Sequence, residues 1–295
     1  MKLKTIAVVL LACASAVSAG NLDEAKYTDT AEKTAHQLRD RILAAANALP
    51  NHPWAGEYYC GDGLGVNVSL LLAPEAGFVF EWHGCLGLYD RNYGAIAETN
   101  GRIHLSCTFK NERKGFQGIA EEFIPVPWGE RRYLIPADNV VGFCNKVNDG
   151  TEPRDAGHGF YLLRDGDENK AVSGFPVLPD EYGRYLLTNP IVAEITDVLS
   201  ATTRPSVCEW RFKDTTVILN AGRNRGLLEG MELHVATPAN LVESVVVTKV
   251  EETTAEAVMT QTGEDRRGPE NGWQLSTRCP WNEKQELTTK GARAP

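Results

Sequence analysis

The stretch YGAIAETNGRIHLSCTF, residues 93–109, decides the class of fold. At its centre stands Asn100-Gly101, the dipeptide most typical of a two-residue β-hairpin turn, because both turn positions take a positive φ. The segments on either side, 93–99 and 102–109, are predicted to be its strands. The stretch therefore predicts an antiparallel hairpin at the centre of a β sheet.

The segments before and after this hairpin have the same texture of short strands and turns. Apolar side chains alternate with polar or small ones on both sides of a turn at 74–77, as they do in half-buried strands. These positions are Val66, Val68, Leu70 and Leu72 before the turn and Phe78, Phe80 and Trp82 after it. Further strands are predicted at 119–124, 131–135 and 158–164. Many short strands at close spacing predict an antiparallel meander over residues 54–164, either a barrel or a sandwich.

A helix is predicted before the meander, over residues 28–49. Small and apolar residues recur there at alternating spacings of four and three, which places them on one helix face. They are Ala31, Ala35, Leu38, Ile42, Ala45 and Leu49. Pro50 and Pro53 end the helix, since proline has no amide hydrogen to continue it. Residues 20–53 are therefore expected to form a helical arm packed on the protein's own body, or else a helix that docks a partner.

A second β unit is predicted over residues 190–279. Residues 165–189 before it are rich in glycine, proline and charge, which indicates a partly packed connector. Strand patterns follow at 191–196, 216–219, 245–250, 255–259 and 273–278. Residues 280–295 are polar and are expected to form a tail without fixed structure. The chain is therefore predicted to be mainly β, with a helical arm and two β units.

The glycines of the second unit have a regular spacing. Gly222, Gly226 and the pair Gly230-Met231 come just before a strand pattern, and the series does not match a nucleotide-binding loop. This spacing resembles the small β-barrel modules of bacterial envelope proteins, such as the C-terminal module of the flagellar assembly protein T and the β-domain of the rod-shape protein MreC. The resemblance implies a small β-barrel, an envelope setting and a structural or binding role. It implies no catalytic residues.

The start of the chain predicts export. Residues 1–19 combine a basic beginning, an apolar run and small final residues, which predicts a secretory signal cleaved before Gly20. The alternative is lipidation of Cys13, because Leu10-Leu11-Ala12-Cys13 is similar to the signal of bacterial lipoproteins. We therefore expect a periplasmic or secreted protein, or one anchored by lipid through Cys13. No transmembrane span is expected, since no segment is apolar over the roughly 20 residues that a spanning helix needs.

The composition excludes two broad classes. The 295 residues include 30 Lys and Arg against 39 Asp and Glu, for a formal net charge of −9. This acidic balance argues against a nucleic-acid partner, because phosphate binding needs clustered basic residues. Hydrophobic residues make up 42% of the chain and charged residues 23%, which argues against a mainly disordered protein.

The cysteines predict disulfide bonds. Six lie outside the signal, an even number as disulfides in an exported protein require: Cys60, Cys85, Cys107, Cys144, Cys208 and Cys279. Their spacing fits no zinc motif, so no metal site is expected. In a meander Cys60, Cys85 and Cys107 fall at one end of the sheet, so two of them are able to pair, although the sequence does not select which two. Cys208 and Cys279 are the pair within the second unit and are predicted to be bonded; the alternative is that both are reduced or paired elsewhere.

A thiol-dependent enzyme is one hypothesis that the residue types allow. His83 and Cys85 are two residues apart in a predicted strand, so they share a face, and Asp90 follows in a predicted loop. A thiolate nucleophile needs a base beside it and a group that orients the base. The alternative for Cys85 is half of a disulfide. The sequence has no hydrolase elbow or metalloprotease motif, and no cofactor is expected.

Three functions remain open at this level. The leading hypothesis is a non-enzymatic exported protein of the bacterial envelope, with a binding or structural role toward an envelope protein or a cell-wall component. The second is a carrier of a small apolar ligand in the first β unit, because aromatic residues are dense between Trp54 and Tyr93. An ordinary packed core explains the same aromatic residues. The third is the enzyme that uses Cys85.

Overall fold

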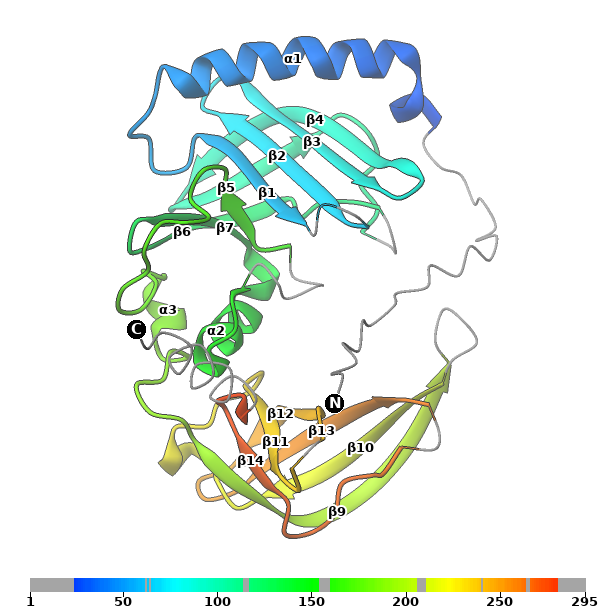
Figure 1. Cartoon of the computed structure of the whole chain (residues 1–295), viewed down its shortest axis with the longest axis vertical. Coiled ribbons are helices and arrows are strands. Elements are labelled where there is room, and N and C mark those ends of the chain that lie inside the picture. The colour runs from blue at the N-terminus through cyan, green and yellow to red at the C-terminus, as the bar shows by residue number, and fades with distance from the viewer. Residues whose placement is uncertain are drawn as a thin grey trace, which may run out of the picture.

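The computed structural model describes residues 24–61, 63, 65–113, 117–153, 160–205, 211–239, 241–263 and 266–280. Over these residues the protein is mainly β and contains two closed antiparallel barrels and an N-terminal helix (Figure 1). The predicted fold class is confirmed, and the meander is closed as a barrel. The predicted signal at 1–19 with Cys13, the tail from 281 and Cys208 lie outside the described residues.

The first barrel is an up-and-down meander whose eighth strand pairs with its first. Its strands are β1 (Gly56–Gly61), β2 (Asn67–Ala73), β3 (Gly77–Gly84), β4 (Gly87–Thr99), β5 (Arg102–Cys107), β6 (Glu122–Trp128), β7 (Arg131–Pro136) and β8 (Leu162–Arg164). Asn100 and Gly101 have φ values of 53° and 73° and join β4 to β5, which confirms the predicted hairpin. Because neighbouring strands are antiparallel, β1, β3, β5 and β7 all finish at one end of the barrel, which we call the odd-strand end.

The N-terminal helix covers the outer face of this barrel. It is α1 (Asp29–Asn47), and it follows the 3-10 turn η1 (Glu24–Tyr27). Thr28 caps the helix, since its hydroxyl oxygen accepts from the amide of Ala31 at 3.2 Å. Its buried face contacts the outside of β1, β2 and β3 (Figure 1). The small residues of the predicted stripe, such as Ala35, let the helix lie close to the sheet, so the stripe serves packing within the chain.

The eighth strand is the shortest of the first barrel. β8 has three residues, and its register contains two pairs with β1 and two with β7. Leu162 points into the barrel core, whereas Leu163 packs outward under a helix. The barrel is therefore closed along a short seam.

A helix that the sequence analysis did not predict lies between the two barrels. It is α2 (Val140–Asp149), entered through η2 (Ala137–Asn139). Val140, Phe143 and Cys144 are fully buried against the outer side of the first barrel, in a core that includes Tyr133 and Leu163. From its opposite side Asn145 binds the second barrel, donating to the Gly230 carbonyl at 2.9 Å and accepting from the Glu232 amide at 3.2 Å.

The second barrel has six strands in the order β10-β13-β12-β11-β14-β9. They are β9 (Val192–Pro205), β10 (Arg211–Leu219), β11 (Glu232–Thr237), β12 (Ser244–Val250), β13 (Ala255–Thr262) and β14 (Gln274–Ser276), with the 3-10 turn η4 (Arg223–Arg225) between β10 and β11. Gly226 and Gly230 have φ values near 85° and turn the chain from η4 into β11. The short helix α3 (Asp180–Gly183) lies in the predicted connector. Among the described helices, none has the length and apolar character to cross a bilayer.

Candidate functional site

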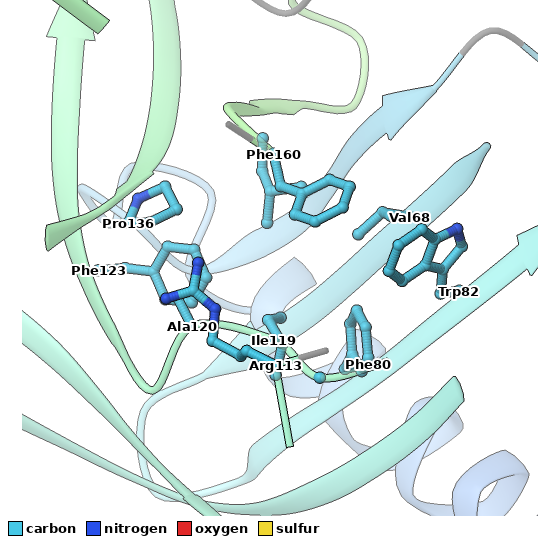
Figure 2. A pocket seen from close by; sticks show the side chains of 11 residues that line it. Val68, Phe80, Trp82, Arg113, Ile119, Ala120, Phe123, Pro136 and Phe160 are labelled. Carbon is cyan, nitrogen blue, oxygen red and sulfur yellow. The ribbon is translucent and has the colours of Figure 1, made fainter. Parts of the chain in front are cut away.

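An apolar pocket lies at the odd-strand end of the first barrel (Figure 2). Its enclosed part measures about 10 Å³, room for about one water molecule, and the empty space reaches about 280 Å³ only when the open mouth is included. The strands contribute Val68, Phe80, Trp82, Phe123, Pro136 and Leu162, and the segments that follow β5 and precede β8 contribute Arg113, Gly118, Ile119, Ala120 and Phe160. The rings of Phe160 and Trp82 meet edge to face, with centroids 4.9 Å apart. The pocket is therefore an aromatic hollow at the end of an otherwise packed barrel.

One wall of the pocket is the segment 118–120, which the polar side chains of Asp90 and Asn111 hold in place. The carboxylate of Asp90, on β4, accepts from the Gly118 amide at 2.6 Å and from its own neighbour, the Arg91 amide, at 2.9 Å. Asn111 binds both the amide and the carbonyl of Ile119. A Cβ atom at Gly118 would overlap the backbone of Glu112, and its φ is +84°. Polar contacts of β4 and Asn111 therefore fix the position of apolar wall residues.

Lys26 completes this support from the N-terminal turn. Its ammonium lies 2.8 Å from the Asp90 carboxylate and donates to the Lys110 carbonyl at 3.1 Å. Lys26 is 3% exposed and Asp90 is fully buried, so the charge of each is balanced mainly by the other. The pair joins η1, β4 and the pocket wall into one unit.

Arg113 is the single charged residue among those that line the pocket. Its guanidinium pairs with Asp138 at 2.5 Å, and its side chain is partly exposed. Arg113 and Ala120 also line an open polar groove on the outside of the barrel, together with residues such as Glu121 and Asp138. Arg113 thus lies between the apolar interior and solvent.

The remainder of the barrel interior is filled. Tyr58, Leu70, Phe78 and Leu134 are fully buried in the core and do not line the pocket. From the sequence, the aromatic residues between Trp54 and Tyr93 are either the lining of a ligand site or an ordinary packed core, and the structure contains both kinds. Phe80 and Trp82 line the hollow, and most of the others pack the core or the outer faces.

His83, Cys85 and Asp90 do not form a catalytic group in this arrangement. Asp90 lies in β4, so the prediction that it stands in a loop is wrong. Its register partner is Trp82, one residue before His83, so its side chain and that of His83 lie on opposite faces. His83 is half exposed, with Nε2 3.6 Å from the Glu81 carboxylate on the outer face. Cys85 is exposed in the turn between β3 and β4.

The cysteines of the first barrel lie as the meander predicts. Cys60, Cys85 and Cys107 stand at or just beyond the ends of β1, β3 and β5, which is the odd-strand end. Within the described residues the structure contains no disulfide bond. Burial raises the pKa of Cys107 to about 12, with Glu121 and Asp90 acting in the same direction, and burial raises the pKa of Cys144 to about 12. The pairing of Cys208 with Cys279 stays a prediction, since Cys208 is not described.

A second polar cluster joins α2 to the second barrel. Asp149 is buried, and its carboxylate lies 3.3 Å from His234 Nε2 and 3.5 Å from the Lys146 ammonium. Burial by itself would raise the pKa of Asp149, but His234, the side chain and amide of Thr151, and Lys146 outweigh burial and lower it. Lys146 also lies 3.7 Å from Glu232. The cluster is a charged contact between α2 and the second barrel.

Sequence reasoning missed several residues that line or support the pocket. Lys26 and Asp90 are 64 positions apart, so no local pattern connects them. Arg113 belongs to a basic doublet in the sequence, but nothing there indicates that it borders an apolar space. Phe160 reaches the pocket through the chain that leads into β8, a placement that depends on closure of the barrel.

Neither metal chemistry nor a known relative identifies this site. Among the described residues no three His, Cys, Asp or Glu side chains lie close enough together to hold a metal ion. No protein-family model matches the chain, and no curated protein or solved structure matches it.

Proposed function

We propose that the protein is a non-enzymatic binding protein of the bacterial envelope whose first barrel holds a small apolar molecule. The observation that carries this proposal is the pocket at the odd-strand end, with its walls of Phe80, Trp82, Phe123 and Phe160. Binding sites for small molecules are concave and mostly apolar, with few polar groups that fix orientation. Arg113 is the polar group of this kind here.

The chemistry of the lining selects the ligand class. The enclosed space of about 10 Å³ is far below that of sites for drug-sized ligands, so the occupant is small and binds only when side chains at the mouth move aside. The rings favour an apolar body, whose burial contributes about 25 cal/mol per Å² of surface removed from water. Arg113 at the mouth favours an acidic end group that takes the place of Asp138, because a guanidinium binds a carboxylate through two parallel hydrogen bonds. A short-chain or aromatic carboxylic acid meets all three conditions.

The envelope setting is supported by the sequence of residues 1–19 and by the resemblance of the glycine series at 222–230 to envelope modules. Mass analysis of the protein from a periplasmic extract tests it. The expected mature chain begins at Gly20. A chain that begins with a lipid-modified Cys13 would instead indicate an anchored protein, and an unprocessed Met1 would contradict export.

Ligand binding is tested with hexanoate and hexanol as probes. Calorimetry and amide NMR should show hexanoate binding, with shifts at Trp82 and Ile119. Val68→Phe fills the pocket and should abolish binding of both probes. Val126→Phe is the matched control, because Val126 is equally buried but belongs to the core under α2.

The acidic end group has its own test. Arg113→Met should weaken hexanoate binding roughly tenfold, which corresponds to about 1.4 kcal/mol, and should leave hexanol binding unchanged. Equal losses for the two probes would contradict the assignment of Arg113. If neither probe binds and native mass spectrometry of protein from the envelope finds no bound molecule, the carrier function is wrong.

A further inference from the structure

One side of β9 extends beyond the closed part of the second barrel without a partner strand among the described residues. β9 pairs with β10 from Ile195 to Pro205, but on its other side β14 pairs only with Val192–Glu194. Backbone hydrogen bonds to Trp273 and from Gly272 extend this contact to Ile195. In the part of the chain that the structure describes, no strand pairs with this side of β9 from Thr196 to Pro205.

The open edge is long and almost uncharged. All ten residues from Thr196 to Pro205 are exposed, including Val198 and Leu199, which is 52% exposed. Its charged residues are Asp197 near the beginning and Arg204 near the end. An exposed strand edge of this length offers unpaired backbone groups to another strand, and proteins usually shorten or block such edges. Figure 1 shows β9 and β10 running together as a long ribbon away from α2.

A bulge brings the two charges onto one face. In the register with β10, Val198 lies opposite Val217 and Ser200 lies opposite Thr216, so Leu199 is an extra residue. As a result four residues of β9 share the outward face with their partners on β10. The pairs are Asp197 with Ile218, Ser200 with Thr216, Thr202 with Asp214 and Arg204 with Phe212. Two contacts agree with this orientation of Arg204: its Nε lies 2.6 Å from Asp214, and its guanidinium lies 4.6 Å from the centre of the Phe212 ring.

This edge is complementary to itself. A twofold axis perpendicular to the sheet, placed at Ala201, sets two β9 strands antiparallel and keeps each face on the same side. Ser200 then lies opposite Thr202 of the second copy. Because Leu199 is an extra residue without a partner, the register shifts by one position beyond it. The next pairs are therefore Val198 with Thr203 and Asp197 with Arg204 of the second copy. The twofold axis generates the Asp197–Arg204 pair a second time, at the other end of the paired strands. The interface therefore has an opposite-charge pair at each end, with apolar and hydroxyl side chains between them. Opposite charges at directly paired positions stabilise antiparallel strands.

We propose that the protein forms a twofold dimer through β9, in which the sheet of one second barrel continues into that of its partner. The occupant of the edge is a second copy of this chain, because the placement of the two charges matches an antiparallel copy of the same strand. Asp197 and Arg204 are roughly 20 Å apart along one strand and do not touch within one chain. The dimer is independent of the ligand pocket.

Charge exchange tests the proposal in the full chain. Sedimentation velocity should detect a concentration-dependent dimer, and Asp197→Arg or Arg204→Glu alone should weaken it at least about tenfold, since each change acts twice across the axis. The double variant Asp197→Arg with Arg204→Glu should restore dimerisation. Because these positions are distant within one chain, the rescue reports contact between copies. Arg223→Glu on η4 is the control and should leave the dimer unchanged.

A cysteine at the axis tests the register. Ala201→Cys should form a disulfide between two identical peptides on mild oxidation, and Thr248→Cys, on an exposed position of β12, should not. The proposal would be overturned if the wild-type chain is monomeric in sedimentation velocity at about 100 µM. A double charge variant that dimerises as poorly as the single variants would also overturn it.

Discussion

Asp90 illustrates how a single buried side chain supports a site that it does not line. It holds the pocket wall through the Gly118 amide and is balanced by Lys26. Removing one member of a buried ion pair leaves the other charge without its partner, which costs far more than the loss of an exposed pair.

Asp90→Asn is therefore expected to lower the free energy of unfolding by about 3 kcal/mol or more. Urea denaturation measures this loss. The double variant Lys26→Met with Asp90→Asn should lose less than the two single variants together, because neither charge is left alone. Glu270→Gln, which breaks an exposed pair with Arg267, is the control and should change the stability far less. A loss at Asp90 no larger than at Glu270 would contradict the structural role of the pair.

Two glycines of the central hairpin are required for different reasons. Gly101 has a φ of +73° and open space around its missing side chain, so Gly101→Val should cost roughly 1–2 kcal/mol through backbone strain. Gly94 has no room, since a Cβ atom would overlap the Ser106 carbonyl of the paired strand, and Gly94→Ala should cost more. Thermal unfolding compares the two with Gly183→Ala, a substitution in open space. A Gly94 variant as stable as the Gly183 variant would refute the steric argument.

At the scale of single residues, the sequence predicted features that depend only on neighbouring positions in the chain. Asn100-Gly101 specified its turn because both positive φ values belong to adjacent residues. The partnership of Lys26 with Asp90 was not predictable, since it depends on how η1 meets β4 in the closed barrel. The same is true of Arg113, whose position beside an apolar pocket follows from the path of the chain after β5.

At the scale of elements, α2 links the two barrels. Its sequence, VVGFCNKVND, is rich in β-branched residues and contains a glycine, so its intrinsic helix propensity is low. Packing of Phe143 and Cys144 on the first barrel and the bonds of Asn145 to the second hold it as a helix. Tertiary contacts therefore decide this element, which explains why the sequence pattern did not predict it.

The charged contact of α2 predicts an acid-sensitive part of the stability. The pKa of Asp149 is below its ordinary value of 3.8 in the folded protein, so the unfolded chain binds more protons around that pH. The stabilisation from Asp149 is fully present at pH values above its ordinary pKa. It is lost as the pH falls through the lower pKa that Asp149 has in the folded protein. The free energy of unfolding of the wild type should therefore decrease below about pH 4 more steeply than that of Asp149→Asn. Urea denaturation at about ten pH values between roughly 2 and 6 measures this difference.

Glu270→Gln is the matched control for this measurement. Arg267 also lowers the pKa of Glu270, but this pair is exposed to solvent, so its contribution is screened. The control should keep the acid slope of the wild type. Parallel slopes for the wild type and the Asp149 variant would show that the contact between α2 and the second barrel does not depend on the charge.

At the scale of the whole molecule, the burial of the cysteines predicts an order of reactivity. Cys85 is exposed, whereas Cys144 is fully buried and has a pKa raised to about 12, which leaves little thiolate at neutral pH. After reduction, a short pulse of iodoacetamide should label Cys85 in the native protein, and Cys144 only when the protein unfolds. Peptide mass spectrometry measures both positions. Rapid labelling of Cys144 in the native state would contradict the packing of α2.

The architecture was the most predictable property of the molecule. Alternating strands at close spacing indicated a meander, and the meander specified that the ends of β1, β3 and β5 lie together. Closure was not predictable, because the β8 to β1 contact joins residues 163 and 59 through a strand of three residues. The pocket exists only after this closure, so its lining was beyond the reach of the sequence.

The short β8 seam has a kinetic consequence for the first barrel. Backbone amides exchange with solvent through local openings, which occur most readily where few hydrogen bonds must break together. β8 is held by two register pairs on either side, and Leu162 within it lines the pocket. We therefore expect the amides of β8 to exchange faster than those of β2 and β3, and release of this strand would open the pocket laterally to a molecule too large for the mouth.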